Sequence, residues 1–141
     1  AGEKDATLLL NIEDNFINEG ENRTFKLLDK MREIYGIDVI FGTDRSISSS
    51  NKQMIQGFRV DSEGFICSEN YELTVLDRIG GGDGFAAGAI HAFITNMDRE
   101  EGINFATCSG VLAHTTYGDS PIATLKQINR MITKESVDII R

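Results

Sequence analysis

A run of glycines constrains this chain most, because it opens a predicted helix in the second half of the sequence. Residues 77–88 read Asp-Arg-Ile-Gly-Gly-Gly-Asp-Gly-Phe-Ala-Ala-Gly. Successive glycines let the backbone turn its N–H groups toward a common point, and a helix that begins there adds the positive end of its dipole. Both features favour an anion. The run therefore predicts a phosphate-binding turn between an apolar segment at 73–76 and a helix from Gly82 to about Asn96.

Asp83 is the acid inside this turn, and its position predicts a catalytic role. A carboxylate at a helix N-terminus lies where negative charge is favoured. If it lies one hydrogen bond from a transferring phosphoryl group, it can accept the proton of an attacking hydroxyl. The turn therefore predicts a kinase with Asp83 as its base.

Three other interpretations of the same residues fit the surrounding sequence less well. A bare glycine run is often a flexible surface loop, but here an apolar segment precedes it and a helix follows. Residues 82–87 also fit the dinucleotide fingerprint G-x-G-x-x-A, yet the second strand that this fold requires is replaced by a helical pattern at 100–115. A Walker-type loop needs a lysine after the glycines, and none follows.

The run resembles the signature of the PfkB/ribokinase family of sugar kinases, an Asp-x-x-Gly-x-Gly-Asp sequence that opens a long helix. Arg78, Ile79 and the later segment His-Thr-Thr-Tyr-Gly-Asp at 114–119 narrow the resemblance toward 2-keto-3-deoxygluconate kinases. The chain departs from that family motif at Ala113, where the family has a lysine.

The resemblance implies a ribokinase-like three-layer α/β/α sandwich and an ATP-dependent kinase that uses Mg²⁺. It implies that Asp83 is the catalytic base and that the backbone N–H groups of Gly80, Gly81, Gly82 and Asp83 form the anion hole. The substrate would be a small sugar or sugar acid, with 2-keto-3-deoxygluconate favoured and fructose or ribose left open.

Four further residues are predicted on the nucleotide side. Asp77 is either merely a loop carboxylate or a residue that orders the turn and, as the resemblance implies, lies near a monovalent cation or a metal-linked water. Arg45 follows a predicted strand and can hold an ATP phosphate through paired donors, or else lie exposed in a loop. His114 and Gly118 belong to the adenine-side segment. A cationic cap at a helix C-terminus is the alternative for His114.

The length of 141 residues suits one domain, and no internal boundary is evident. Because kinases of this family are much longer, we interpret residues 1–141 as the C-terminal, nucleotide-binding half, without the sugar-contacting residues and the small β-lid. The family's Asn-x-x-Glu segment, linked to magnesium, aligns with Gly2 and Asp5, so no metal ligand is assigned. The alternative is an ATP-binding module without turnover.

Composition restricts the partners. A net charge of −8 opposes binding to nucleic acid. Cys67 and Cys108 lie too far apart for a metal or redox motif, and we expect two buried thiols in a reducing cytoplasm. No segment approaches the roughly 20 apolar residues of a membrane span, so a soluble protein is expected. Self-association into a homo-oligomer stays open.

The remaining pattern predicts alternating helices and strands. A helix capped by Asn22 should end at Gly36, and the apolar run 37–41 should be an inner parallel strand buried on both faces. Residues 61–64 should form a hairpin turn between strands at 54–60 and 65–68. Two more helices are expected at 100–115 and at about 123–131, with Pro121 in the first turn of the last.

Overall fold

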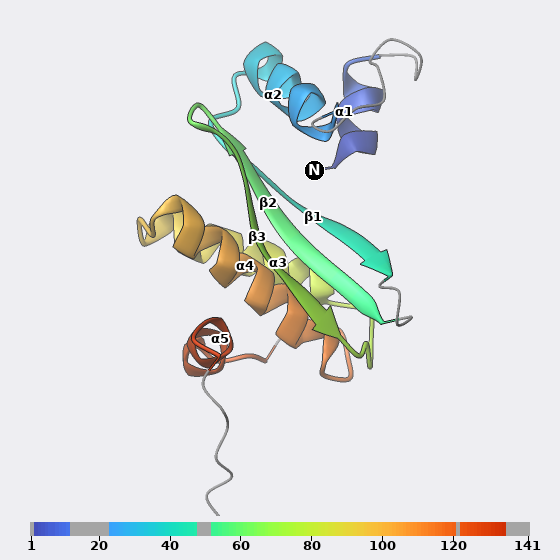
Figure 1. Ribbon diagram of the computed structural model, residues 1–141, viewed down its shortest axis with the longest axis vertical. Helices are drawn as coiled ribbons and strands as arrows, with labels where there is room; N and C mark the ends of the chain where they lie inside the picture. Colours follow the sequence, from blue (N-terminus) through green and yellow to red (C-terminus); the bar gives the residue numbers. More distant parts are fainter. Residues whose placement is uncertain (1, 12–22, 48–51, 121, 135–141) are drawn as a thin grey trace, which may run out of the picture.

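The computed structural model describes residues 2–11, 23–47, 52–120 and 122–134 (Figure 1). Its elements follow in the order α1 (Glu3–Leu9), α2 (Arg23–Tyr35), β1 (Ile40–Ile47), β2 (Gln53–Asp61), β3 (Gly64–Leu73), α3 (Gly81–Ile94), α4 (Arg99–His114) and α5 (Leu125–Ile132). The fold is mixed α/β, as predicted. None of the helices in the described ranges is long and apolar enough to cross a membrane.

The described strands form one antiparallel sheet in the order β1-β2-β3. The hairpin predicted at 61–64 is confirmed, because Asp61 pairs with Gly64 across a two-residue turn. Gly64 has φ +107°, a left-handed conformation that glycine adopts without strain. A register shift between Gln56 and Phe58 bends β2.

The prediction for the first strand was wrong in its pairing. The run 37–41 was expected to be an inner parallel strand, but β1 starts at Ile40, continues to Ile47 and pairs with β2 in antiparallel fashion. Among the described strands, β1 lies at the edge of the sheet. An apolar run shows that a strand is buried without showing which strand lies beside it, so its pairing depends on segments distant in sequence.

Helices pack on both faces of the sheet, because successive residues of a strand point to opposite sides. On β1, Ile40 packs with α1 and α2, whereas Phe41 packs with α3 and α4. On β3, Phe65 packs on the side of α1 and α2, and Ile66 packs on the side of α3 and α4. The core on the α1–α2 side consists of Ala6, Leu27, Leu28, Met31, Ile40, Phe58 and Val60.

Small residues bring α3 and α4 into close contact. A Cβ at Gly84 would lie 2.8 Å from the Cβ of Ala113, and one at Gly88 would lie 2.8 Å from the Cα of Ala106. The Ser109 hydroxyl donates to the Gly84 carbonyl at 2.8 Å. The backbones can approach this closely only because the side chains between them are absent.

Helix α1 was not predicted. Gly36 ends α2 with φ +63°, as expected, whereas Asn22 lies outside the described residues. Helix α5 begins at Leu125 after a Thr124 cap, two residues later than predicted, and Pro121 lies outside the described residues. Cys108 is buried, but Cys67 is exposed, because it faces a groove beside α1 and α2.

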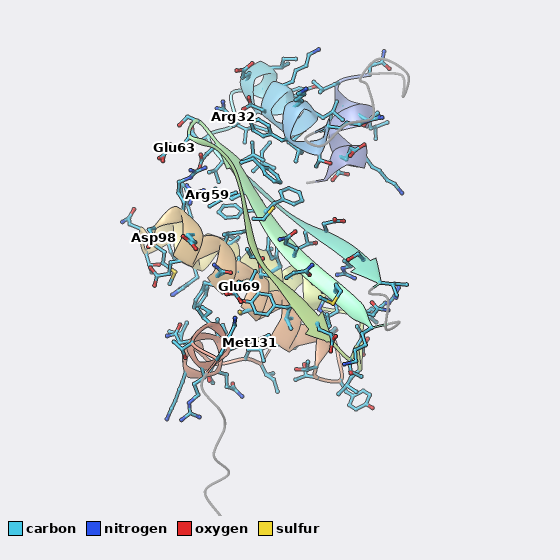
Figure 2. The ribbon with its side chains drawn as sticks, in the orientation of Figure 1. Arg32, Arg59, Glu63, Glu69, Asp98 and Met131 are labelled. Atoms are coloured by element: carbon cyan, nitrogen blue, oxygen red, sulfur yellow. The ribbon has the colours of Figure 1, made fainter. Side chains whose placement is uncertain are left out.

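An ion cluster joins the hairpin to the start of α4. The buried Asp61 carboxylate pairs with Arg59 at 2.7 Å and with Arg99 at 2.8 Å, and it accepts from the N–H of Glu63 at 2.9 Å. Figure 2 shows Arg59 and Glu63 at the hairpin, near Asp98 at the start of α4. Burial alone would raise the pKa of Asp61, but the Glu63 N–H and the two guanidinium groups hold it below its usual range.

Candidate anion and nucleotide site

The glycine turn leads directly into α3 and leaves its first amides free. Gly80 is the N-cap, with φ +80°, and its carbonyl accepts from the N–H of Gly84 at 2.8 Å. No described residue accepts a hydrogen bond from the N–H groups of Gly81, Gly82 or Asp83. Unpaired N–H groups at a helix N-terminus, together with its dipole, favour an anion.

Asp83 lies in the first turn of α3 and is exposed, as is Gly82, while Gly80 and Gly81 are buried. Its carboxylate is therefore accessible to a ligand beside the free amides. This arrangement suits a base that works next to a bound phosphate, because one helix start holds both the anion site and the proton acceptor.

Gly82 lines an open groove of about 790 Å³ between three elements. The other walls are the N-terminal residues 2–5, the β1 residues 41–44 and the next turns of α3. Gly2 and Asp5, the positions aligned with the family's magnesium-linked segment, thus lie around the same groove as the glycine turn. The N–H of Gly2 donates to the Asp5 carboxylate at 2.7 Å.

Asp77 joins the glycine turn to the loop that follows α4. One carboxylate oxygen accepts from the N–H of Ile79 at 3.0 Å, and the other accepts from the N–H of Gly118 at 3.3 Å. These hydrogen bonds lower the pKa of Asp77 below its usual range. The Asp77 carboxylate therefore connects the glycine turn to the loop that follows α4.

The loop at 115–120 lies against the turn. A Cβ at Gly80 would come within 2.6 Å of the Asp119 carbonyl, so only glycine fits there. Gly118 has φ +101° and carries the N–H that reaches Asp77. Gly118 is exposed, so its backbone stays accessible from outside.

His114 lies under the turn. Its side chain is 1% exposed, and its Nδ1 is 2.7 Å from the Gly110 carbonyl oxygen. Its own carbonyl accepts from the N–H of Leu76 at 2.9 Å. The imidazole is buried because the last turn of α4 faces the inside of the α3–α4 pair.

Arg45 is not brought to the turn with the other predicted residues. It lies within β1, where a loop had been expected, opposite Ile55 of β2, and it is exposed. Its neighbours Thr43 and Asp44 line the groove, whereas Arg45 is not part of that lining.

In the described ranges, no group of three or more His, Cys, Asp or Glu side chains is arranged to hold a metal ion.

Two features of the site, the placement of residues 2–5 and the burial of His114, depend on contacts between segments far apart in the chain. The contribution of residues 2–5 to the groove depends on a contact between the start of the chain and α3, for which only the alignment of Gly2 and Asp5 gave a signal. The burial of His114 had a signal in the small residues Gly81 and Gly110, which leave room for a ring between the helices.

Three solved structures resemble this arrangement over nearly all or all of the chain. A candidate 2-keto-3-deoxygluconate kinase from Enterococcus faecalis matches with 35% sequence identity and a TM-score of 0.89, over 100% of this chain and 41% of that chain. A PfkB family carbohydrate kinase from Listeria grayi matches with 25% identity and a TM-score of 0.80, over 94% of this chain and 40% of that one. A 2-dehydro-3-deoxygluconokinase from Thermotoga maritima matches with 25% identity and a TM-score of 0.80, over 93% and 39%.

The chain therefore spans about two fifths of the length of these kinases. The resemblance to PfkB and 2-keto-3-deoxygluconate kinases that the motifs predicted is confirmed as a match to part of such a kinase. No family model and no curated protein matches the chain.

Proposed function

We propose that this chain is the nucleotide-binding part of an ATP-dependent carbohydrate kinase of the PfkB family. The observation that carries the proposal is the open start of α3, where three backbone N–H groups have no described acceptor and the Asp83 carboxylate is exposed. The 35% identity to a candidate 2-keto-3-deoxygluconate kinase supports the same chemistry. The proposed substrate is 2-keto-3-deoxygluconate, with fructose and ribose as alternatives.

In the proposed reaction, the γ-phosphoryl group of ATP lies over residues 80–83. Asp83 accepts the proton of a sugar hydroxyl, the hydroxyl oxygen bonds to phosphorus, and the bond to the oxygen of ADP breaks. The N–H groups of Gly81 and Gly82 stabilise the negative charge on the transferring group. Phosphoryl transfer depends mainly on positioning and on such charge stabilisation, which a rigid helix start supplies.

Mg²⁺ would supply charge neutralisation on the phosphates when bound with ATP. Magnesium is usually held by one or two carboxylates together with substrate phosphates, so its site does not require the three-ligand cluster that the described residues lack. The half-buried Asp77 carboxylate is the candidate for an outer contact with a metal-linked water or a monovalent cation. Arg45 remains a proposed phosphate ligand.

The architecture proposed for the complete kinase is a ribokinase-like three-layer α/β/α sandwich. Residues 1–141 would be its C-terminal, nucleotide-binding portion, and the sugar contacts and lid would lie in the remainder. The helices on both faces of the described sheet, together with the coverage of 41% of the E. faecalis chain, support this arrangement.

A second candidate function is an ATP-binding module without turnover. The observation that favours it is that the chain spans only about two fifths of the matched kinases. Titration of the chain with ATP and Mg²⁺, paired with a phosphorylation assay on 2-keto-3-deoxygluconate, separates the two functions. Binding without product identifies a module, whereas absence of binding contradicts both.

The kinase proposal is tested further in a protein of kinase length. This chain would be joined to the part of the E. faecalis protein that the match leaves uncovered, and sugar phosphate formed from ATP would be measured. We expect turnover that depends on Asp83. A panel with fructose and ribose then determines the sugar.

A further inference from the structure

We propose that His114 is a positioning residue of the anion site, because its buried imidazole holds the first amides of α3 in place from below. The inference rests on the proposed function and deepens it. His114 would act through Gly81 and would not itself contact the phosphate.

The His114 ring lies against Gly81, the first residue of α3. A Cβ built on Gly81 would lie 1.9 Å from Cε1 of His114, 2.4 Å from Nε2 and 2.5 Å from Nδ1. The imidazole therefore fills the volume that a side chain at position 81 would need. The His114 ring thus occupies the side-chain space of position 81 and packs directly against Gly81, the first residue of α3.

A hydrogen bond to the Gly110 carbonyl holds the His114 ring in place. A carbonyl oxygen only accepts, so the 2.7 Å contact with Gly110 requires that Nδ1 carries a proton and donates it. Gly110 in turn lies against the turn, since a Cβ there would be 3.2 Å from the Gly81 carbonyl oxygen. The hydrogen bond therefore fixes the ring plane between two glycines.

His114 contacts the glycine turn through its backbone as well as through its ring. Its carbonyl accepts from the N–H groups of Leu76 and Asp77, at 2.9 and 3.4 Å, so the segment that enters the turn is tied to the same residue. The segment that enters the turn and the first residue of α3 are thus both held by His114, at the end of α4.

Ordinary packing does not explain why this buried side chain is polar. Nε2 is buried and has no hydrogen-bond partner among the described residues, which costs stability relative to an apolar side chain. An apolar residue would fill the core better but could not make the Nδ1 hydrogen bond that orients the ring. The polar ring is therefore explained by orientation of the turn.

The test uses the ¹⁵N-labelled 141-residue chain, with Mg²⁺·ATP and, separately, inorganic phosphate as probes. In His114→Asn, the side-chain amide keeps the donor to Gly110 but empties the space under Gly81. We expect a folded protein whose Kd for Mg²⁺·ATP rises about tenfold, with smaller shifts of the amide signals of residues 81–83. His91→Asn, which removes a histidine stacked on Phe105 elsewhere in the α3–α4 interface, should bind as the wild type does.

A double variant keeps the test decisive if His114→Asn does not fold. His114→Ala loses the support, and adding Gly81→Ala places a methyl group in the vacated space. We expect the double variant to bind Mg²⁺·ATP more tightly than His114→Ala alone, with the amide shifts of residues 82 and 83 partly restored.

Two results would overturn the inference. One is a folded His114→Asn protein with the wild-type Kd and wild-type amide shifts. The other is a double variant that binds no better than His114→Ala. Failure of the proposed function looks different, because the wild-type amides of residues 81–83 would then not respond to either probe.

Discussion

Helices α3 and α4 lie side by side but begin in opposite ways. At the start of α4, the Asp98 side chain accepts from the N–H of Glu101 at 2.8 Å, and two glutamates lie in the first turn. At the start of α3, the cap is Gly80, no side chain accepts from the helix, and the first amides are open. A helix that caps itself with an acid uses its own anion, whereas α3 keeps the position for an external one.

The supports of the two helix starts also differ. Arg99, the first residue of α4, is tied to the hairpin by the charge of Asp61. The start of α3 is held by shape, with His114 below Gly81 and the loop at 119 against Gly80. Support by shape brings no side-chain acceptor to the cap of α3, which leaves its first amides available for a phosphate.

The largest expected effect is on catalysis at the open helix start. In the kinase-length protein, Asp83→Asn should lower kcat by about 10²–10⁴-fold, because a positioned base is lost. Stability should change little, since Asp83 is exposed. Steady-state assays with ATP and 2-keto-3-deoxygluconate measure the effect. Asp98→Ala removes an acid at the neighbouring helix start and should retain the rate, and a near-normal rate in Asp83→Asn would rule out the role of base.

The next largest effect concerns the charged support of α4. Asp61→Asn should lower the free energy of unfolding by about 3 kcal/mol, the lower end for a broken buried pair because both arginines stay partly exposed. Urea unfolding measures it. Asp29→Asn, which breaks the more exposed pair with Arg32, should cost under about 1 kcal/mol and serves as the control.

The same pair predicts a pH dependence. Because the pKa of Asp61 is lowered in the folded state, its contribution is fully present above about pH 4, the ordinary value of an aspartate, and is lost as the pH falls through the folded pKa. The Tm of the wild type should therefore fall below pH 4, and that of Asp61→Asn should fall less. Equal slopes for the two proteins would contradict the assignment.

A smaller effect tests the support by shape. Gly81→Ala should destabilise the protein by about 1–3 kcal/mol, because its Cβ meets the ring of His114 at 1.9 Å. Gly82→Ala should cost little stability, since nothing lies within 4 Å of a Cβ there. Thermal unfolding compares the two neighbours, and equal losses would show that the ring does not constrain position 81.

The smallest effect is the loss of the α4 cap. Asp98→Ala should cost about 1 kcal/mol, the usual value for an N-cap acid. Chemical denaturation measures this loss. If it left stability unchanged, the contrast between a self-capped α4 and an open α3 would disappear.

Local patterns predicted most helices and strands of the fold and the glycine turn that begins α3. The turn at residues 80–83 and the hairpin at 61–64 both follow from backbone preferences within short windows. The pairing of β1, the helix α1 and the exposure of Cys67 did not follow, since each depends on which distant segment covers a surface.

His114 shows the same limit inside the site. The sequence shows a histidine at a helix end near a functional loop, and both a ligand contact and a structural position are compatible with that. Its burial under Gly81 required the angle and separation of two helices, which many weak contacts set together.

The amino-acid order by itself determined a glycine turn that cannot avoid presenting backbone N–H groups, followed by an acid on the next residue, because glycine conformations and helix geometry act over a few bonds. Tertiary structure alone decided that residues 2–5 line the groove beside Gly82, that Arg45 lies on an exposed part of the sheet and that an imidazole supports the turn. These placements arise from packing between segments far apart in the chain, which no local preference encodes.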